Sequence, residues 1–298
     1  MGLSKQELSE TAVEEARDEM TDCTTYKRLA SSEKAQTNKD MFEKLSAMEH
    51  NHYELWKRYC PPGTKEIGPK RATVSLVLFL RRLFGASFAI KFLERREKST
   101  VAKYEALKSS VPAEDQAAFQ SMIEDEKGHE TAFADVVAGS YVKYISFIVL
   151  GLADALVEIA GIHAGSLGIY DSTELTGLAG IVAGAAASLA MASAAFAQAK
   201  QGFEGSPGLA AGYTGGSYFV AAVALALPYF LTKTMLVAIT SSVVVGLGII
   251  AFVTWYNSII VGSRFLREFS ELAGVMLGAT FALYVFGSVI RAAFGITI

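Results

Sequence analysis

The sequence predicts an all-α protein in which a four-helix bundle is followed by a five-helix transmembrane bundle. Hydrophobic residues make up 51% and charged residues 19% of the 298 positions, and the mean hydropathy is +0.32, which is too apolar for an ordinary soluble protein. Charged residues are concentrated before Val142, whereas the second half contains five apolar segments of about 20 residues, each long enough to cross a membrane. We therefore expect a polar domain over residues 1–138 and a transmembrane domain over residues 139–298.

Two helices are predicted between residues 5 and 60, because apolar and aromatic residues recur there at helical spacing. The short polar segment SSEKAQTN separates them and predicts an antiparallel hairpin. The segment CPPGTKEIGPKR then supplies three of the six prolines, which stop the second helix and predict a linker.

A long third helix is predicted from Thr73 to Ser110, where the chain has no proline. Pro112 separates it from a fourth helix that we expect to run from Ala113 to about Asp135. Two helix pairs joined by a long crossover have the connectivity of ferritin-like bundles.

The start of the third helix, TVSLVLFLRRLFGASFAIKF, is apolar enough to raise the question of a membrane span. Arg81 and Arg82 argue against a span, because a charge near its centre costs roughly 2.5 to 3.5 kcal/mol. We interpret residues 74–91 as an amphipathic helix that lies along the membrane surface or along a partner subunit.

Five membrane spans are predicted in the second half of the chain. They cover approximately residues 142–166, 175–199, 213–231, 234–256 and 269–292. The second of them is rich in Gly and Ala, which allows helices to approach closely, and we expect it at a bundle or homodimer interface.

The orientation follows from the loops between these spans. The positive-inside rule places the loop with Arg264 and Arg267 in the cytoplasm and the loop with Asp171 and Glu174 on the other side. The first twenty residues are polar and contain no apolar signal region, so we expect the amino-terminal domain to stay cytoplasmic.

Two classes of function are not supported. A formal net charge of -3 without a basic patch argues against binding to nucleic acid. Cys23 and Cys60 form no Cys-x-x-Cys pair, which argues against a zinc ribbon or a rubredoxin-type iron site and fits a reducing cytoplasm.

A repeated pattern of glutamate and histidine is the most specific signal in the first half. The first helix of each pair has a Glu followed by a Tyr seven residues later, and the second has Phe-x6-Glu-x-x-His. The residues are Glu19 with Tyr26, Glu97 with Tyr104, Phe42 with Glu49 and His52, and Phe119 with Glu126 and His129. Because residues three or seven apart share a helix face, this pattern predicts a di-iron or di-manganese site. Carboxylates with one imidazole per metal favour iron or manganese over copper or zinc.

Glu94 lies one helical turn before Glu97 and has two readings: a further metal ligand, or a partner in a surface ion pair with Arg95 or Lys98. His50 and Glu130 are interpreted as surface residues.

On these motifs, residues 10–135 resemble the rubrerythrin branch of the ferritin-like superfamily. The resemblance implies that the metal ligands are Glu19, Glu49, His52, Glu97, Glu126 and His129, with Glu94 as an additional carboxylate. No four-cysteine rubredoxin module accompanies them, so peroxide reduction through that electron donor is not expected.

Ionisable residues inside a predicted span are costly and usually functional. Asp154 and Glu158 lie one turn apart in the first span, so both can face one ion pathway. His163 near the end of that span is either a ligand or an interfacial residue. Met191 in the second span has two readings, a packing residue or a soft ligand for Fe²⁺.

The second half, from about Tyr141 onward, resembles the vacuolar iron transporter family. The resemblance rests on GLADALVEIAG, AGAAASLAMASAAFAQ, GGSYFVAAVALALPYF and GVMLGATFALYVFG, and it places Asp154 and Met191 on the translocation pathway. Two features depart from the family pattern: Ala195 stands where a glutamate is usual, and the segment between the second and third spans is short.

These patterns predict a transporter that exports Fe²⁺, or Mn²⁺, from the cytoplasm across the cell membrane, as a homodimer and in possible exchange for protons. The bundle would capture the metal or oxidise it, and no catalytic residue is assigned. One alternative is a membrane-anchored ferroxidase or peroxidase, and another is a metal-stabilised dimerisation module. An anchor has no need for Asp154 and Glu158, which favours transport.

Overall fold

A computed structural model describes the backbone of residues 5–138, 141–167, 169 and 172–294. It describes the side chains of residues 6–95, 100–128, 143–167, 169 and 172–294. All elements of the described chain are helical, which confirms the predicted all-α class. The chain divides into two compact units, Met1–Val142 and Lys143–Ile298, which are considered separately below.

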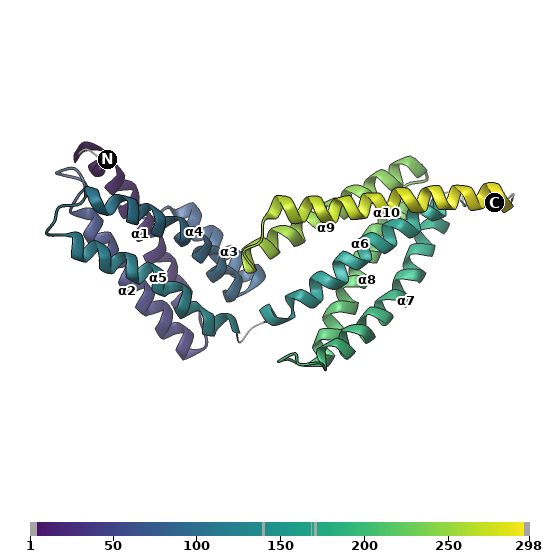
Figure 1. Cartoon of the computed structure of the whole chain (residues 1–298), viewed down its shortest axis with the longest axis horizontal. Helices are drawn as coiled ribbons and strands as arrows, with labels where there is room; N and C mark the ends of the chain where they lie inside the picture. The colour runs from purple at the N-terminus through teal and green to yellow at the C-terminus, as the bar shows by residue number, and fades with distance from the viewer. Residues whose placement is uncertain (1–4, 139–140, 168, 170–171, 295–298) are drawn as a thin grey trace. The chain divides into compact units, whose positions relative to one another are not determined.

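The described part of the first unit forms five α-helices. They are α1 (Lys5–Ser31), α2 (Gln36–Lys57), α3 (Arg71–Phe84), α4 (Ala86–Leu107) and α5 (Gln116–Ala138), with the short helix η1 (Lys108–Ser110) after α4. Helices α1 and α2 pack along each other, α4 packs against α5, and α2 also contacts α5 (Figure 1). The predicted hairpin and the proline-containing linker are therefore present.

The single long helix expected from Thr73 to Ser110 is wrong. The helix ends at Gly85, whose φ of +85° lies in a region that residues with a Cβ rarely adopt. Helix α3 has only 14 residues, too few to span a bilayer. Arg81 lies 3.3 Å from Glu33 and donates to the carbonyl of Ser32 at 2.9 Å, so it is fixed within this unit.

Two apolar clusters lie at different positions along the paired helices α1 and α2. The first contains Ala12 and Ala16 of α1 with Tyr53 and Trp56 of α2. The second contains Tyr26 and Leu29 of α1 with Phe42 and Leu45 of α2. Positions between them on both helices therefore face a buried layer with apolar contacts above and below.

Among its described residues, the second unit has five helices long and apolar enough to cross a membrane, which confirms the five predicted segments and is consistent with a multi-pass membrane protein. They are α6 (Ile145–Leu167), α7 (Thr173–Ala199), α8 (Pro207–Leu231), α9 (Met235–Ile260) and α10 (Phe265–Phe294), and the short helix η2 (Tyr141–Tyr144) precedes them. Helix α6 packs against α7, α8, α9 and α10 (Figure 1). The outer surface carries large apolar side chains such as Leu189 and Phe281, about 70% exposed, as lipid contact requires.

Close helix approach in this unit depends on glycine. A Cβ on Gly151 of α6 would lie 2.2 Å from the carbonyl oxygen of Thr214 in α8. A Cβ on Gly287 of α10 would lie 2.1 Å from the carbonyl oxygen of Gly165 in α6. These contacts pack α8 and α10 directly against the backbone of α6.

Candidate metal centre

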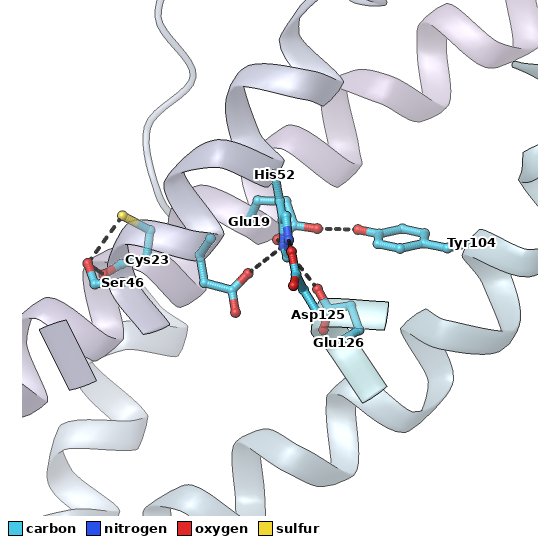
Figure 2. A network of polar contacts seen from close by, with 8 residues as sticks. Glu19, Cys23, Ser46, His52, Tyr104, Asp125 and Glu126 are labelled. Carbon is cyan, nitrogen blue, oxygen red and sulfur yellow. Dashed lines mark hydrogen bonds and ion pairs between the residues drawn. The ribbon is translucent and has the colours of Figure 1, made fainter. Parts of the chain in front are cut away.

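Four buried side chains from three helices converge in the first unit. Glu19 comes from α1, Glu49 and His52 from α2, and Glu126 from α5, and one ligand atom from each lies within 4.8 Å of the others. Figure 2 shows Glu19, Glu126 and Asp125 gathered around His52. Three carboxylates and one imidazole form a donor set that suits a divalent cation such as Fe²⁺ or Mn²⁺.

The fold places these residues in the layer between the two apolar clusters. Glu19 follows Ala16 and precedes Tyr26 on α1, and the three-residue spacing of Glu49 and His52 puts both on the face of α2 that meets α1. Glu126 reaches the same point because α2 also packs against α5.

His52 is the common contact of the group. Its Nδ1 lies 3.2 Å from Glu49 Oε2, 3.3 Å from Glu126 Oε1 and 3.7 Å from Glu19 Oε2. Its Nε2 lies 3.5 Å from Asp125 Oδ2, so a half-buried carboxylate holds the far side of the ring. Such a second carboxylate orients an imidazole that binds metal through its other nitrogen.

The electrostatics show that this group retains protons in the absence of a cation. Burial opposes a charge on His52, but hydrogen bonds to Glu126, Glu19 and Glu49 outweigh it and raise the pKa of the imidazole. Burial raises the pKa of Glu49 well above its ordinary value. Burial also acts to raise the pKa of Glu19, but the hydrogen bond and charge of His52 prevail and lower it. A divalent cation would take the place of the retained protons.

Tyr104 of α4 supports the group from a fourth helix. Its hydroxyl donates a hydrogen bond to Glu19 Oε1, as Figure 2 shows. The ring is 1% exposed, and burial raises the pKa of its phenol, so the hydroxyl remains a donor. One turn earlier on α1, buried Glu15 pairs with Lys103, the neighbour of Tyr104.

The structure brings together four of the seven ligands that the sequence predicts. Glu94 is buried, and its Oε2 accepts a hydrogen bond from Lys91 Nζ at 2.6 Å. The side chain of Lys98, one of its two predicted ion-pair partners, lies outside the described residues. Glu97 and His129 lie outside the residues whose side chains are described. The contact of Asp125 with His52 was not predicted from the sequence. The available signal was its position next to Glu126, a predicted ligand.

The two carboxylates that the sequence assigns to an ion pathway, Asp154 and Glu158, lie on α6 of the second unit. Glu158 Oε2 accepts a hydrogen bond of 2.6 Å from the hydroxyl of Tyr218, a fully buried residue of α8. Asp154, one turn earlier, is half-buried. Met191 of α7 packs against the core cluster that includes Ala155, the neighbour of Asp154. Tyr218 was not identified from the sequence, where it reads as one more aromatic residue in an apolar segment.

His163 is buried inside the second unit at 1% exposure, so its side chain packs among the helices. Its ring lies 4.5 Å from that of Tyr229 in α8, and a Cβ on Gly180 of α7 would lie 2.0 Å from its Nε2. Within the described chain neither ring nitrogen has a hydrogen-bond partner.

Comparisons with models of protein families, with curated proteins and with solved structures give no match to this chain. The functional argument therefore rests on the residues and their geometry.

Proposed function

We propose that this protein is a divalent metal transporter that exports Fe²⁺, or Mn²⁺, from the cytoplasm across the cell membrane. In this proposal the first unit is a cytoplasmic, ferritin-like domain that captures the metal, and two copies of the chain assemble as a homodimer. Protons are the proposed exchange partner, because carboxylates along a pathway can carry either a proton or a cation.

The observation that carries the proposal is the carboxylate pair on α6. Asp154 and Glu158 sit one turn apart within a helix apolar enough to span the membrane, and Tyr218 fixes Glu158 in place. A charged side chain in such a helix costs about 2.5 to 3.5 kcal/mol on insertion scales, so its retention implies a use. A helix that served only as an anchor would need neither group.

The buried group of the first unit supports the choice of metal. Glu19, Glu49, Glu126 and His52 offer hard oxygen donors with a single imidazole, a set that favours iron or manganese. Acidic residues often cluster on protein surfaces without binding a metal. This cluster differs from them, because all four of its side chains are buried.

A second candidate function, a membrane-anchored ferroxidase or peroxidase, is favoured by a different observation. Tyr104 donates directly to Glu19, so an oxidisable phenol touches the buried group. In that case the spans would not transport, and the reaction at the first unit would be the whole activity.

Transport assays with Asp154→Asn distinguish the two functions. The variant keeps the shape of the side chain and removes its charge, so we expect correct folding and a strong loss of Fe²⁺ and Mn²⁺ flux in proteoliposomes under a pH gradient. Glu158→Gln should lose less flux and change its pH dependence. Met191→Leu should reduce flux of Fe²⁺ modestly and spare Mn²⁺.

Glu271→Gln serves as the control, because Glu271 is an exposed carboxylate paired with Arg267 one turn earlier on α10. All proteins are compared at equal incorporation into the vesicles. Undiminished uptake of both metals by Asp154→Asn would overturn the transport proposal and favour the anchored ferroxidase.

A further inference from the structure

A line of aromatic side chains runs from the buried carboxylate–histidine group toward the surface of the first unit. Tyr104 donates to Glu19 and its ring centroid lies 5.3 Å from that of Trp56 in α2. Trp56 in turn lies 6.4 Å from Tyr59, which is only half-buried. Three readily oxidised side chains therefore connect the buried group to the protein exterior.

The two tyrosines of this line have hydrogen-bond acceptors for their phenolic protons, whereas the tryptophan between them has none among the described residues. Tyr104 donates to Glu19 and Tyr59 donates to Asp115, so each phenol faces a carboxylate that can take its proton. The indole N–H of Trp56 is buried and has no hydrogen-bond partner among the residues that the structure describes. An oxidised Trp56 cannot pass its proton to a neighbour and is not trapped there, whereas an oxidised Tyr59 can be stabilised by losing its proton.

The outer end of the line opens on a cavity of about 1080 Å³. Tyr59 lines it together with Ser9, Arg58, Cys60, Pro61 and Ser110. Burial and the hydrogen bond to Asp115 raise the pKa of Tyr59, so its phenol is protonated when a molecule enters. The Arg58 guanidinium lies 3.6 Å from Asp115 Oδ1, whereas the hydroxyl of Tyr59 donates to Asp115 Oδ2. The cavity is large enough to admit a small organic reductant.

We propose that Tyr104, Trp56 and Tyr59 form an electron-transfer chain through which a small one-electron reductant of the ascorbate class, bound in this cavity, reduces an oxidant at the buried carboxylate–histidine group. This inference goes beyond metal transport and needs only an oxidant at the inner end.

Each transfer balances in electrons and protons. The oxidant gains one electron, Tyr59 loses one, and the phenolic proton moves to Asp115, which leaves a neutral tyrosyl radical beside a neutral carboxylic acid. The reductant then returns one electron to Tyr59, and Asp115 returns the proton. With hydrogen peroxide as the oxidant, two such transfers and two protons from solvent yield two water molecules.

Electron paramagnetic resonance of the full chain tests the proposal. Protein supplied with Fe²⁺ is mixed with hydrogen peroxide and frozen rapidly. We expect a tyrosyl radical in the wild type whose lifetime ascorbate shortens. In Tyr59→Phe and in Trp56→Phe the radical should remain on buried Tyr104, and ascorbate should no longer shorten its lifetime. Both variants keep an aromatic ring at the substituted position and remove the readily oxidised one.

Tyr53→Phe is the matched control. Tyr53 is a buried tyrosine of α2, the helix that carries Trp56, and its hydroxyl accepts a hydrogen bond from the backbone N–H of Ile67. Its radical signal should equal that of the wild type. A tyrosyl radical whose lifetime ascorbate shortens as much in Tyr59→Phe or Trp56→Phe as in the wild type would overturn the proposal.

A metal-free arm separates this proposal from the proposed function. A ruthenium photo-oxidant is attached to Ala106→Cys, an exposed position of α4 near Tyr104, in a chain with Cys23→Ser and Cys60→Ser. Flash oxidation should place the radical on Tyr59, and Trp56→Phe should abolish that transfer. Failure of iron binding would leave this result unaffected, whereas equal yields with and without Trp56 would overturn the electron-transfer chain.

Discussion

His52 explains how three carboxylates can share one buried site. Three acidic groups repel one another in a medium of low dielectric constant, and the imidazole Nδ1 lies within 3.7 Å of all three. Asp125 holds the opposite nitrogen at 3.5 Å, which orients the ring toward the three glutamates. The site is therefore organised before a cation enters it.

Removal of two carboxylates tests the assignment of the ligands. Wild-type protein is expected to bind about two metal ions per chain, as di-metal carboxylate bundles do. Loss of groups that merely support ligands weakens binding about 10- to 100-fold, so Glu49→Ala with Glu126→Ala should weaken it at least as much. Elemental analysis measures the metal content, with exposed Glu54→Ala of the same helix as the control. Equal content in the double variant would show that the ligands lie elsewhere.

The retained protons predict how metal binding depends on pH. The raised pKa values of His52 and Glu49 mean that the metal-free fold is stabilised by their protonated forms. The contribution of His52 is complete below about pH 6.5, the value in the unfolded chain, and declines as the pH rises above it. Raising the pH should therefore destabilise the metal-free protein and favour the cation.

Melting temperatures measure this effect. Added Fe²⁺ or Mn²⁺ should raise the melting temperature more at about pH 8 than at about pH 6, because the cation replaces bound protons. The variant Glu49→Ala with Glu126→Ala should show no metal-dependent rise at either pH. A rise that is larger at the lower pH would contradict the proposed exchange of protons for metal.

Helices α1 and α2 divide their facing surfaces into apolar, polar and apolar layers. The aromatic clusters around Trp56 and around Phe42 lie on either side of Glu49 and His52. Burial of the clusters supplies the free energy that offsets the desolvation of the charged layer between them. The layer of charged side chains thus depends on the apolar clusters that flank it on both helices.

In the membrane unit, helix contact depends on small residues. His163 fits against α7 because Gly180 has no Cβ, and Gly180→Ala would place a carbon 2.0 Å from its ring nitrogen. Overpacking of this kind usually costs about 1 to 3 kcal/mol. Thermal unfolding of the protein in detergent should show Gly180→Ala to be less stable than wild type.

Gly216→Ala, on α8, is the control, because a Cβ there meets no atom within 4 Å. In the double variant with His163→Ala, most of the lost stability should return. Equal stability of Gly180→Ala and Gly216→Ala would show that His163 does not pack tightly against α7.

The whole chain joins a buried group that could hold a metal ion to helices that are long and apolar enough to cross a membrane. If the first unit captures metal for export, Glu49→Ala with Glu126→Ala should reduce flux strongly at limiting Fe²⁺ and little at saturating Fe²⁺. Proteoliposome uptake at several Fe²⁺ concentrations measures this difference. Cross-linking of the same variant tests the alternative that metal stabilises the dimer: a lost dimer with normal flux per assembled particle would favour that reading.

The sequence by itself determined the all-α class, the hairpin before the proline-containing linker and the five apolar helices of the second unit. It also placed Glu49 and His52 on one face of a single helix. These features are local, because helical periodicity, prolines and the length of an apolar run act over one or two dozen residues. The break at Gly85 is local as well, but an isolated glycine in an apolar run does not predict a helix end on its own.

Only the tertiary structure decided which residues from different helices meet. It brought Glu19 and Glu126 to His52, gave Tyr104 to Glu19, and joined Tyr218 to Glu158. Except for Glu19 and His52, the partners are separated by 60 or more residues in the sequence. No local sequence pattern sets the distance between their side chains in space. Helix packing sets it, through the shapes of the apolar side chains and the glycine contacts that fix how closely and at what register two helices lie.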